Sequence, residues 1–237
     1  MIKERVVAYE HNGAVLEGFL ACDDATDKPR PGILISHAWA GRGEFECQKA
    51  RDLAELGYAG FALDLYGKGV LGSGPEENTR LMTPFLQDRA LLQARMQRSL
   101  EIMQAQPEVD SKKAAAIGFC FGGLCVLDLA RIDSNIKGVI SFHGLFNPPA
   151  NFKARKIKAK VLVLHGNDDP MVPVEMVTAL EQELTRAGAD WQIHVYGNTK
   201  HAFTNPQAND SDMGTVYNAK ADRRSWQAMR NFLEELF

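Results

Sequence analysis

Apolar and polar positions along the chain follow two different periods, one typical of strands and one typical of helices. Residues 3–10 and 14–21 are strand-like runs joined by an Asn-Gly pair, a common signal for a β-hairpin. After a polar, proline-containing segment at residues 23–31, short apolar runs alternate with longer amphipathic stretches. This alternation predicts an α/β fold with a mostly parallel central sheet, helices on both faces and an N-terminal antiparallel hairpin.

The elements of the predicted parallel sheet can be placed by residue number. We expect strands at residues 33–37, 60–65, 114–119, 138–142, 160–164 and 192–196, and helices at residues 45–56, 85–106, 122–131, 174–187 and 217–236. Residues 66–84 begin with several glycines and contain Pro75 and Pro84, which predicts a loop that covers the site. Ligands of such sheets bind beyond the carboxyl ends of the strands, so residues there are the ones to consider.

The composition is that of an ordinary globular protein. The 237 residues are 45% hydrophobic and 24% charged, and no repeat or composition shift divides them, so we expect a single domain over residues 1–237. The N-terminus is charged and no run approaches about 18 apolar residues, which predicts a cytoplasmic protein. The four cysteines are too scattered for a disulfide framework, which fits a reducing compartment.

Charge and short motifs narrow the class of partner. The net charge is −3 and no basic block is present, which argues against nucleic acid or a membrane as partner. The glycines at 67–74 are not followed by the Gly-Lys-Ser/Thr of a phosphate loop, and Cys120 and Cys125 lack the spacing of a zinc or redox pair. We therefore expect a small-molecule ligand, no cofactor or metal, and a monomer or homodimer.

A cysteine framed by glycines marks the centre of the predicted site. Residues 118–123 read Gly-Phe-Cys-Phe-Gly-Gly and connect an expected strand to an expected helix. A residue on so sharp a turn has a strained backbone and tolerates only minimal neighbours two places away, which Gly118 and Gly122 provide. The helix that follows favours the thiolate of Cys120, and the N–H of Phe121 is placed to meet an oxyanion. The alternative is a buried structural cysteine, which would not require the glycines.

A nucleophilic thiolate needs a partner that protonates the leaving group and then activates water, and histidine suits both tasks. His201 lies in the loop after the last expected strand, from which its side chain can reach Cys120. Three other histidines end expected strands and are more simply explained as structural residues: His37, His143 and His165.

The third member of such a site is a carboxylate that orients the imidazole. Asp168 and Asp169 both follow a strand beyond the cysteine, and their spacing does not choose between them. Asp64 is a weaker candidate at another strand end, while Asp110 is expected in a turn and Asp128 on a helix surface. The resulting chain order is nucleophile, acid, histidine.

At these residues the chain resembles the dienelactone hydrolase family of α/β-hydrolases, from about residue 31 to the end. The cysteine turn is similar to the nucleophile elbow of this family, residues 165–173 to its acid loop, and His201-Ala202-Phe203 to its histidine loop. The resemblance selects Asp169 over Asp168 and implies a triad of Cys120, Asp169 and His201.

The resemblance also covers the loop that follows the first parallel strand, and there the chain departs from the family pattern. Residues 37–41 resemble the oxyanion loop, which implies the N–H of Trp39 as a second donor beside Phe121. Ala38 stands where well-known members have a Glu that contacts the resting thiol. Glu44 and Glu46 lie at the start of the following helix, and we do not substitute either for that Glu.

Two side chains bear on the expected substrate. Asn205 stands where the resemblance implies a carboxylate-binding Arg, and Arg80 is a candidate cation in its place. These departures favour a neutral ester or lactone over an acidic dienelactone. We therefore expect a cysteine hydrolase of small carboxylic esters or lactones that forms a thioester acyl-enzyme. Hydrolysis of neutral phosphotriesters by the same triad is the alternative reaction, and a ligand-binding or thiol-sensing protein without turnover is the alternative class.

Overall fold

The structure is a computed structural model and describes residues 1–150 and 155–237. The chain forms two compact units, Met1–Ile117 and Gly118–Phe237, and strand β5 (Val109–Phe119) runs from the first into the second. Both units are of the α/β type. The single domain expected from the sequence stays a prediction.

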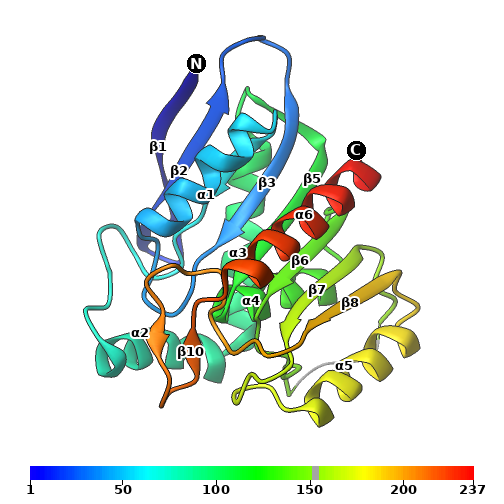
Figure 1. Cartoon of the computed structure of the whole chain (residues 1–237). Coiled ribbons are helices and arrows are strands. Elements are labelled where there is room, and N and C mark those ends of the chain that lie inside the picture. The colour runs from blue at the N-terminus through cyan, green and yellow to red at the C-terminus, as the bar shows by residue number, and fades with distance from the viewer. Residues whose placement is uncertain (151–154) are drawn as a thin grey trace. The chain divides into compact units, whose positions relative to one another are not determined.

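The first unit contains strands in the order β1-β2-β4-β3-β5 (Figure 1). Its remaining elements are β1 (Ile2–His11), β2 (Ala14–Asp23), β3 (Arg30–Ser36), α1 (Glu44–Glu55), β4 (Ala59–Ala62), α2 (Pro75–Gln87) and α3 (Arg89–Gln104). The predicted hairpin is confirmed, because β1 pairs antiparallel with β2 from Ile2 opposite Asp23 to His11 opposite Ala14. β2 and β4 are also antiparallel, whereas β3 and β4 are parallel.

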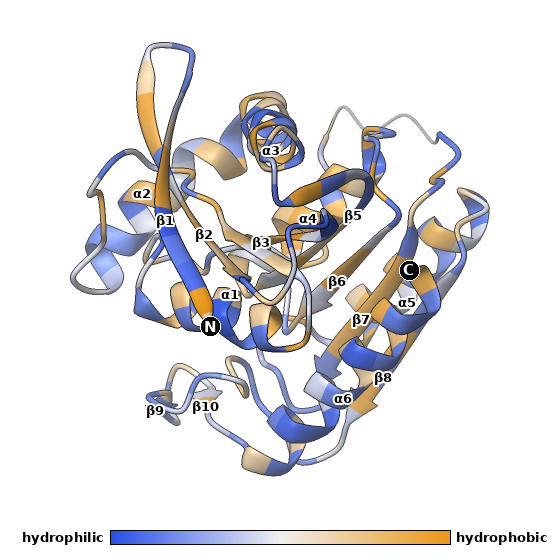
Figure 2. Ribbon diagram, turned by 90° about the horizontal axis from the view of Figure 1, so that it is seen from above, coloured by the Kyte–Doolittle hydropathy of each residue, from blue (hydrophilic) through white to orange (hydrophobic). Residues whose placement is uncertain are grey.

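Helices α1 and α3 cover opposite faces of these strands, as Figures 1 and 2 together show. The approach of α1 is close, since a Cβ added at Gly60 of β4 would lie 2.6 Å from the backbone oxygen of Ala50. The prediction of a loop over residues 66–84 is wrong in its second half, where α2 forms. Pro75 is the first helical residue, a position whose N–H needs no partner, so this proline begins a helix. Asp88 then ends α2, and its carboxylate accepts the N–H of Leu91 to cap α3.

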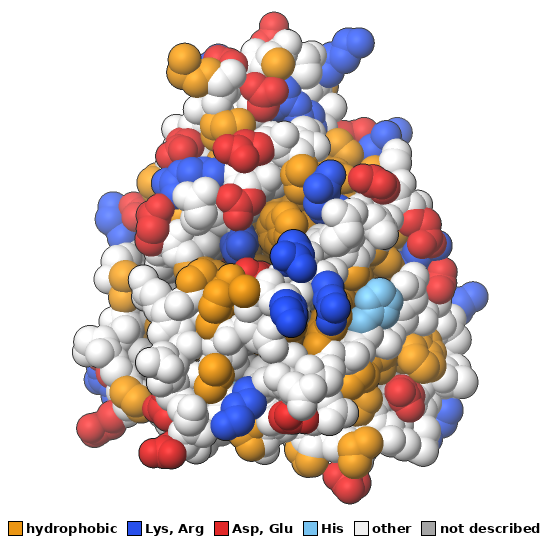
Figure 3. Space-filling view, viewed as in Figure 1, with side chains coloured by type: hydrophobic (Ala, Val, Ile, Leu, Met, Phe, Trp, Pro, Cys, Tyr) orange, Lys and Arg blue, Asp and Glu red, His pale blue; other side chains and the backbone are white. Residues whose placement is uncertain are grey.

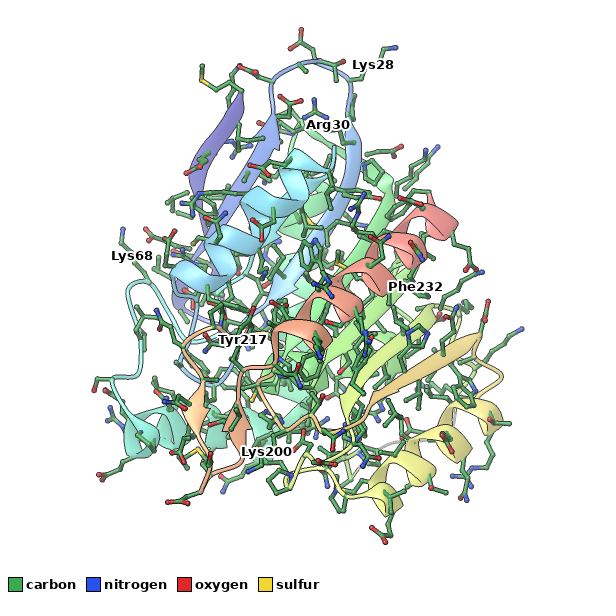
Figure 4. The ribbon with its side chains drawn as sticks, viewed as in Figure 1. Lys28, Arg30, Lys68, Lys200, Tyr217 and Phe232 are labelled. Atoms are coloured by element: carbon green, nitrogen blue, oxygen red, sulfur yellow. The ribbon has the colours of Figure 1, made fainter. Side chains whose placement is uncertain are left out.

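The second unit contains parallel strands in the order β6-β7-β8. Its elements are α4 (Phe121–Arg131), β6 (Gly138–Phe142), β7 (Lys160–Gly166), α5 (Val174–Arg186), β8 (Trp191–Tyr196), the short strands β9 (Asn209–Asp210) and β10 (Thr215–Val216), and α6 (Ala219–Leu236). Helix α6 packs on β6, where a Cβ added at Gly138 would lie 3.0 Å from the ring of Phe232, labelled in Figure 4.

The hydropathy of the residues agrees with this arrangement of strands and helices. The strands are largely apolar in Figure 2, and α6 has a buried face that includes Met229, Phe232 and Leu233. Its outer face carries Lys220, Arg223 and Arg224, all exposed, and Figure 3 shows Lys and Arg side chains gathered where α6 lies in Figure 1. The predicted α/β class, with mostly parallel strands and an N-terminal antiparallel hairpin, is confirmed.

Two further observations concern the chain as a whole. Across residues 1–150 and 155–237, none of the helices combines the length and apolar character that crossing a bilayer requires. The four cysteines all lie in described segments and are reduced thiols, of which Cys22, Cys47 and Cys125 are buried and Cys120 is partly exposed.

Candidate active site

Cys120 occupies a strained turn between β5 and α4. Its backbone has φ 56° and ψ −115°, a conformation that L-residues rarely adopt. A Cβ added at Gly118 would lie 2.0 Å from the carbonyl oxygen of Gly122, so the chain can turn here only with glycine at position 118. The turn leaves the thiol partly exposed at the N-terminus of α4.

His201 and Asp169 are brought together from two loops of the same unit. Nδ1 of His201 lies 2.7 Å from Oδ2 of Asp169, and both side chains are buried. The other carboxylate oxygen, Oδ1, accepts the N–H of Met171, which orients the carboxyl group. Asp168 is exposed and bonded to the side chain of Asn167 instead. The contact is therefore with Asp169, the residue that the resemblance selected.

The loop that carries His201 is anchored by its backbone. The N–H of His201 donates to the carbonyl of Gly214, and the carbonyl of His201 accepts the N–H of Val216 in β10. On the other side, a Cβ added at Gly166 would lie 2.4 Å from the carbonyl oxygen of Thr199, so the acid and histidine loops are in close contact. Sequence periodicity did not predict β9 and β10, which are two residues long.

The electrostatics of this cluster favour a charged imidazole. Burial works against the cation, but the negative charges of the Cys120 thiolate and Asp169 outweigh it and raise the pKa of His201 to about 10. Nε2 of His201 is buried, and an interaction of the ring with the side chain of Cys120 contributes to the raised pKa. Asp169 thus holds one ring nitrogen, and the other remains available for proton transfer.

The predicted oxyanion loop lies in the first unit, and a side-chain hydrogen bond anchors its backbone. Tyr66 donates its hydroxyl proton to the carbonyl of Trp39, 2.9 Å away, and Gly41 adopts φ 100°. The backbone N–H of Trp39 has no acceptor among the described residues. Phe121, the other predicted donor, is the first residue of α4 and is buried.

Glu46 is a buried group that sequence reasoning did not place in this loop. It lies in the first turn of α1, as expected, but its carboxylate turns back and accepts the N–H groups of Ala38 and Gly43. Burial raises its pKa to about 7 against the opposing effect of these hydrogen bonds. A Glu three residues after the N-cap Gly43 was the available sequence signal, since a side chain there can accept the N–H of the N-cap residue.

His143 is a second residue that the sequence left as structural. It follows β6, is buried, and contacts both the cysteine turn and the histidine loop. The backbone N–H of Cys120 is shared between two acceptors, the carbonyl of Phe142 at 3.0 Å and Nδ1 of His143 at 3.2 Å. The ring of His143 lies 5.2 Å from that of His201 between centroids. His37 and His165 are also buried, and burial lowers the pKa of each.

The remaining predicted residues have simpler surroundings. Arg80 lies on α2 with 74% of its side chain exposed and pairs with Glu77. Asn205 forms a turn, because its side-chain oxygen accepts the N–H of Gln207. Asp64 accepts the N–H groups of Tyr66 and Gly67, and Asp110 that of Lys112, which are turn contacts. In the described residues, no group of three or more His, Cys, Asp and Glu is arranged to hold a metal ion.

The placement of Asp128 on a helix surface is wrong. Its side chain is buried and pairs with Arg131 at 3.0 Å, while Arg131 also pairs with Glu183 of α5 at 2.7 Å. The helical period around Asp128 does not reveal this, because α4 is buried along its whole length. This cluster therefore belongs to the packing of α4 on α5.

The chain is similar to known proteins in sequence and in fold. The model of the dienelactone hydrolase family matches residues 16–237. The chain belongs to this family. Two similar solved structures are m3DLH, at 38% identity, and a dienelactone hydrolase-like promiscuous phosphotriesterase from metagenomic libraries, at 37% identity. Each covers 100% of this chain and 99% of its own, with a TM-score of 0.95. An uncharacterised protein of Caenorhabditis elegans is 36% identical over 149 residues, which are 62% of this chain and 94% of that protein.

Membership of the dienelactone hydrolase family confirms the resemblance seen in the sequence and identifies the chain as an enzyme that hydrolyses ester bonds. The α/β-hydrolase fold is confirmed in the same way. The N–H of Ala38 donates to the carboxylate of Glu46.

Proposed function

We propose that the chain is a cysteine-dependent hydrolase of small carboxylic esters or lactones, with Cys120, His201 and Asp169 as its catalytic triad. The observation that carries the proposal is the buried 2.7 Å hydrogen bond between His201 and Asp169, next to Cys120, whose thiolate charge raises the pKa of the same imidazole. A nucleophile on a strained turn, a base and an orienting carboxylate are the three parts that acyl transfer requires.

The proposed reaction has two halves. The Cys120 thiolate attacks the acyl carbon, and the carbonyl electrons move to an oxyanion that accepts the N–H groups of Phe121 and Trp39. As the carbon–oxygen bond breaks, Nε2 of His201 protonates the leaving alkoxide and a thioester remains. His201 then takes a proton from water, the resulting hydroxide attacks the thioester, and the thiolate leaves with the carboxylic acid as product.

The surroundings of Arg80 and Asn205 favour a neutral substrate over an acidic one. Asn205 is engaged in a turn, and Arg80 is exposed with its charge shared by Glu77. Neither side chain offers the buried cation that a substrate carboxylate would need. We expect kcat/KM for neutral lactones and esters to exceed that for acidic lactones of the same ring size, and Arg80→Ala to change neither value. A loss confined to acidic substrates would assign Arg80 to binding.

The nucleophile is tested by Cys120→Ala, assayed with an activated aryl ester. Turnover should be abolished while the circular dichroism spectrum is unchanged, and Cys125→Ala is the control, since Cys125 is a buried thiol one helical turn away. Cys120→Ser should be poor, because an alcohol needs far more help from the base. Full turnover by Cys120→Ala would refute the triad. A stoichiometric burst without turnover in the wild type would indicate the ligand-binding or thiol-sensing alternative.

Attack on phosphorus is a second candidate, and similarity to the promiscuous phosphotriesterase favours it. The thiolate would form a bond to phosphorus, an aryloxide would leave, and water would release the enzyme from the thiophosphate ester. Steady-state rates on matched aryl esters and aryl phosphotriesters separate the two reactions. Turnover of the phosphotriester that disappears in Cys120→Ala would assign both activities to one site.

A further inference from the structure

Both ring nitrogens of His143 have hydrogen-bond partners, and these partners determine which nitrogen carries the proton. The backbone N–H of Cys120 is only a donor, so the Nδ1 atom that receives it at 3.2 Å must carry a lone pair. The proton is then on Nε2, which donates to the hydroxyl of Thr204 at 2.8 Å. His143 is therefore a neutral imidazole with a single tautomer.

The surroundings keep His143 neutral. Burial lowers its pKa well below the ordinary value, and the neighbouring His201 lowers it further. A second proton on Nδ1 would also point at the N–H of Cys120. His201 can thus carry the positive charge of the cluster while the ring beside it stays uncharged. The two rings are T-shaped, with an interplanar angle of 67°.

Three of the six non-glycine residues with positive φ in the described part of the chain belong to this cluster. Cys120, His143 and Ala202 have φ values of 56°, 37° and 56°, and none is glycine. Left-handed backbone at such residues costs energy and persists where the surrounding structure holds it in place. His143 contacts the other two segments directly, since its ring meets the N–H of Cys120 on one side and the loop of His201 and Thr204 on the other.

We propose that His143 is a positioning residue, which aligns the Cys120 thiol with His201. Its Nδ1 shares the N–H of Cys120 with the carbonyl of Phe142, and its Nε2 holds the histidine loop through Thr204. The inference deepens the proposed function and rests on it, because it assumes that Cys120 and His201 react together. It assigns no direct contact between His143 and the substrate.

Two substitutions of His143 test the roles of its Nδ1 and Nε2 atoms separately. In His143→Asn the amide oxygen replaces the Nδ1 acceptor, and asparagine tolerates positive φ well. In His143→Gln the amide nitrogen reaches the place of Nε2, and the N–H of Cys120 keeps only the carbonyl of Phe142 as its acceptor. We expect His143→Asn to retain most of the wild-type kcat and His143→Gln to lose roughly 10-fold to 100-fold in kcat with little change in KM. Equal kcat values for the two variants would overturn the proposal.

Alkylation of Cys120 by iodoacetamide gives a readout that does not require turnover. The other three thiols are buried, so the reaction reports on Cys120. Its rate should fall in His143→Gln and be preserved in His143→Asn. A wild-type rate in His143→Gln refutes the positioning role, whereas full ester turnover by Cys120→Ala refutes the proposed function, so the two failures are distinguishable.

Thr204 provides a second test that leaves the strained backbone of His143 intact. Thr204→Val removes the acceptor for the Nε2 proton, and Thr204→Ser, the matched control, keeps the hydroxyl. Thr204→Val should lower both kcat and the alkylation rate, with Thr204→Ser close to wild type. If both Thr204 variants match the wild type, the link between His143 and the histidine loop is not used. Thermal unfolding of each variant shows that the native fold is retained.

Discussion

Nδ1 of His201 lies 2.7 Å from Oδ2 of Asp169, while the adjacent Asp168 faces solvent. A carboxylate in this position accepts a hydrogen bond from Nδ1–H and leaves Nε2 to exchange protons with substrate. Asp169→Asn would offer a donor to Nδ1 and favour the wrong tautomer. We expect kcat to fall by up to about 10⁴-fold, and Asp168→Asn, the matched control, to stay near wild type. Equal losses in the two variants would contradict the assignment.

The same pair predicts a pH dependence. With the pKa of His201 at about 10, the imidazolium that protonates the leaving group persists at neutral pH and is lost as the pH rises through that value. The rate of ester hydrolysis should therefore decline only at strongly alkaline pH. Because Asp169 raises the pKa of His201, its replacement by Asn should move this decline to lower pH. An unchanged alkaline limb would show that His201 is not the titrating group.

Gly118 should tolerate no side chain. A Cβ there would lie 2.0 Å from the carbonyl oxygen of Gly122, and a backbone atom cannot yield as a flexible side chain can. We expect Gly118→Ala to lower the free energy of unfolding by about 1–3 kcal/mol or more and to remove activity. Gly197→Ala is the control in the same unit, because a Cβ at Gly197 meets nothing within 4 Å. Urea unfolding compares the two, and equal midpoints would refute the steric account.

Arg131 is predicted to matter for stability rather than for chemistry. Its buried guanidinium pairs with Asp128 and Glu183, so Arg131→Met leaves two carboxylates without their cation. The expected loss is about 3–5 kcal/mol of unfolding free energy. Lys158→Met removes an exposed ion pair with Asp133 and should cost less than about 1 kcal/mol. Similar losses in both variants would contradict the difference in burial.

The raised pKa of Glu46 predicts that stability falls as the pH rises. A carboxylate whose pKa is lowered on folding has the opposite effect. Burial raises its pKa from 4.5 to about 7, so between these values the unfolded chain releases a proton that the folded chain keeps. Stability should therefore fall as the pH rises through this window and level off above it. Glu46→Gln removes the titrating group, and its stability should be flatter than that of the wild type. Glu44→Gln, at an exposed neighbour, should keep the wild-type slope, and parallel profiles for all three proteins would refute the prediction.

Local sequence features predicted most of the helices and strands. The Asn-Gly hairpin, the parallel strands and the helix that ends at Arg131 were expected close to their observed bounds. Residues 75–87 were assigned to a loop because proline was read as a break, whereas Pro75 begins α2 and Pro84 is accommodated within it. The helix boundary at Asp88 depends on a side-chain cap that periodicity does not reveal.

The sequence by itself determined the turn at Cys120, because the steric need for glycine on either side acts over a few residues, and its resemblance to a family selected Asp169 and His201. Only the tertiary structure decided several of the side-chain contacts within each unit. The hydrogen bond from His143 to Thr204 spans 61 residues of chain, and the N–H of Ala38 reaches the buried carboxylate of Glu46 across a loop. Periodicity reports which face of an element is buried, whereas such contacts depend on the path of distant segments, which local patterns do not contain.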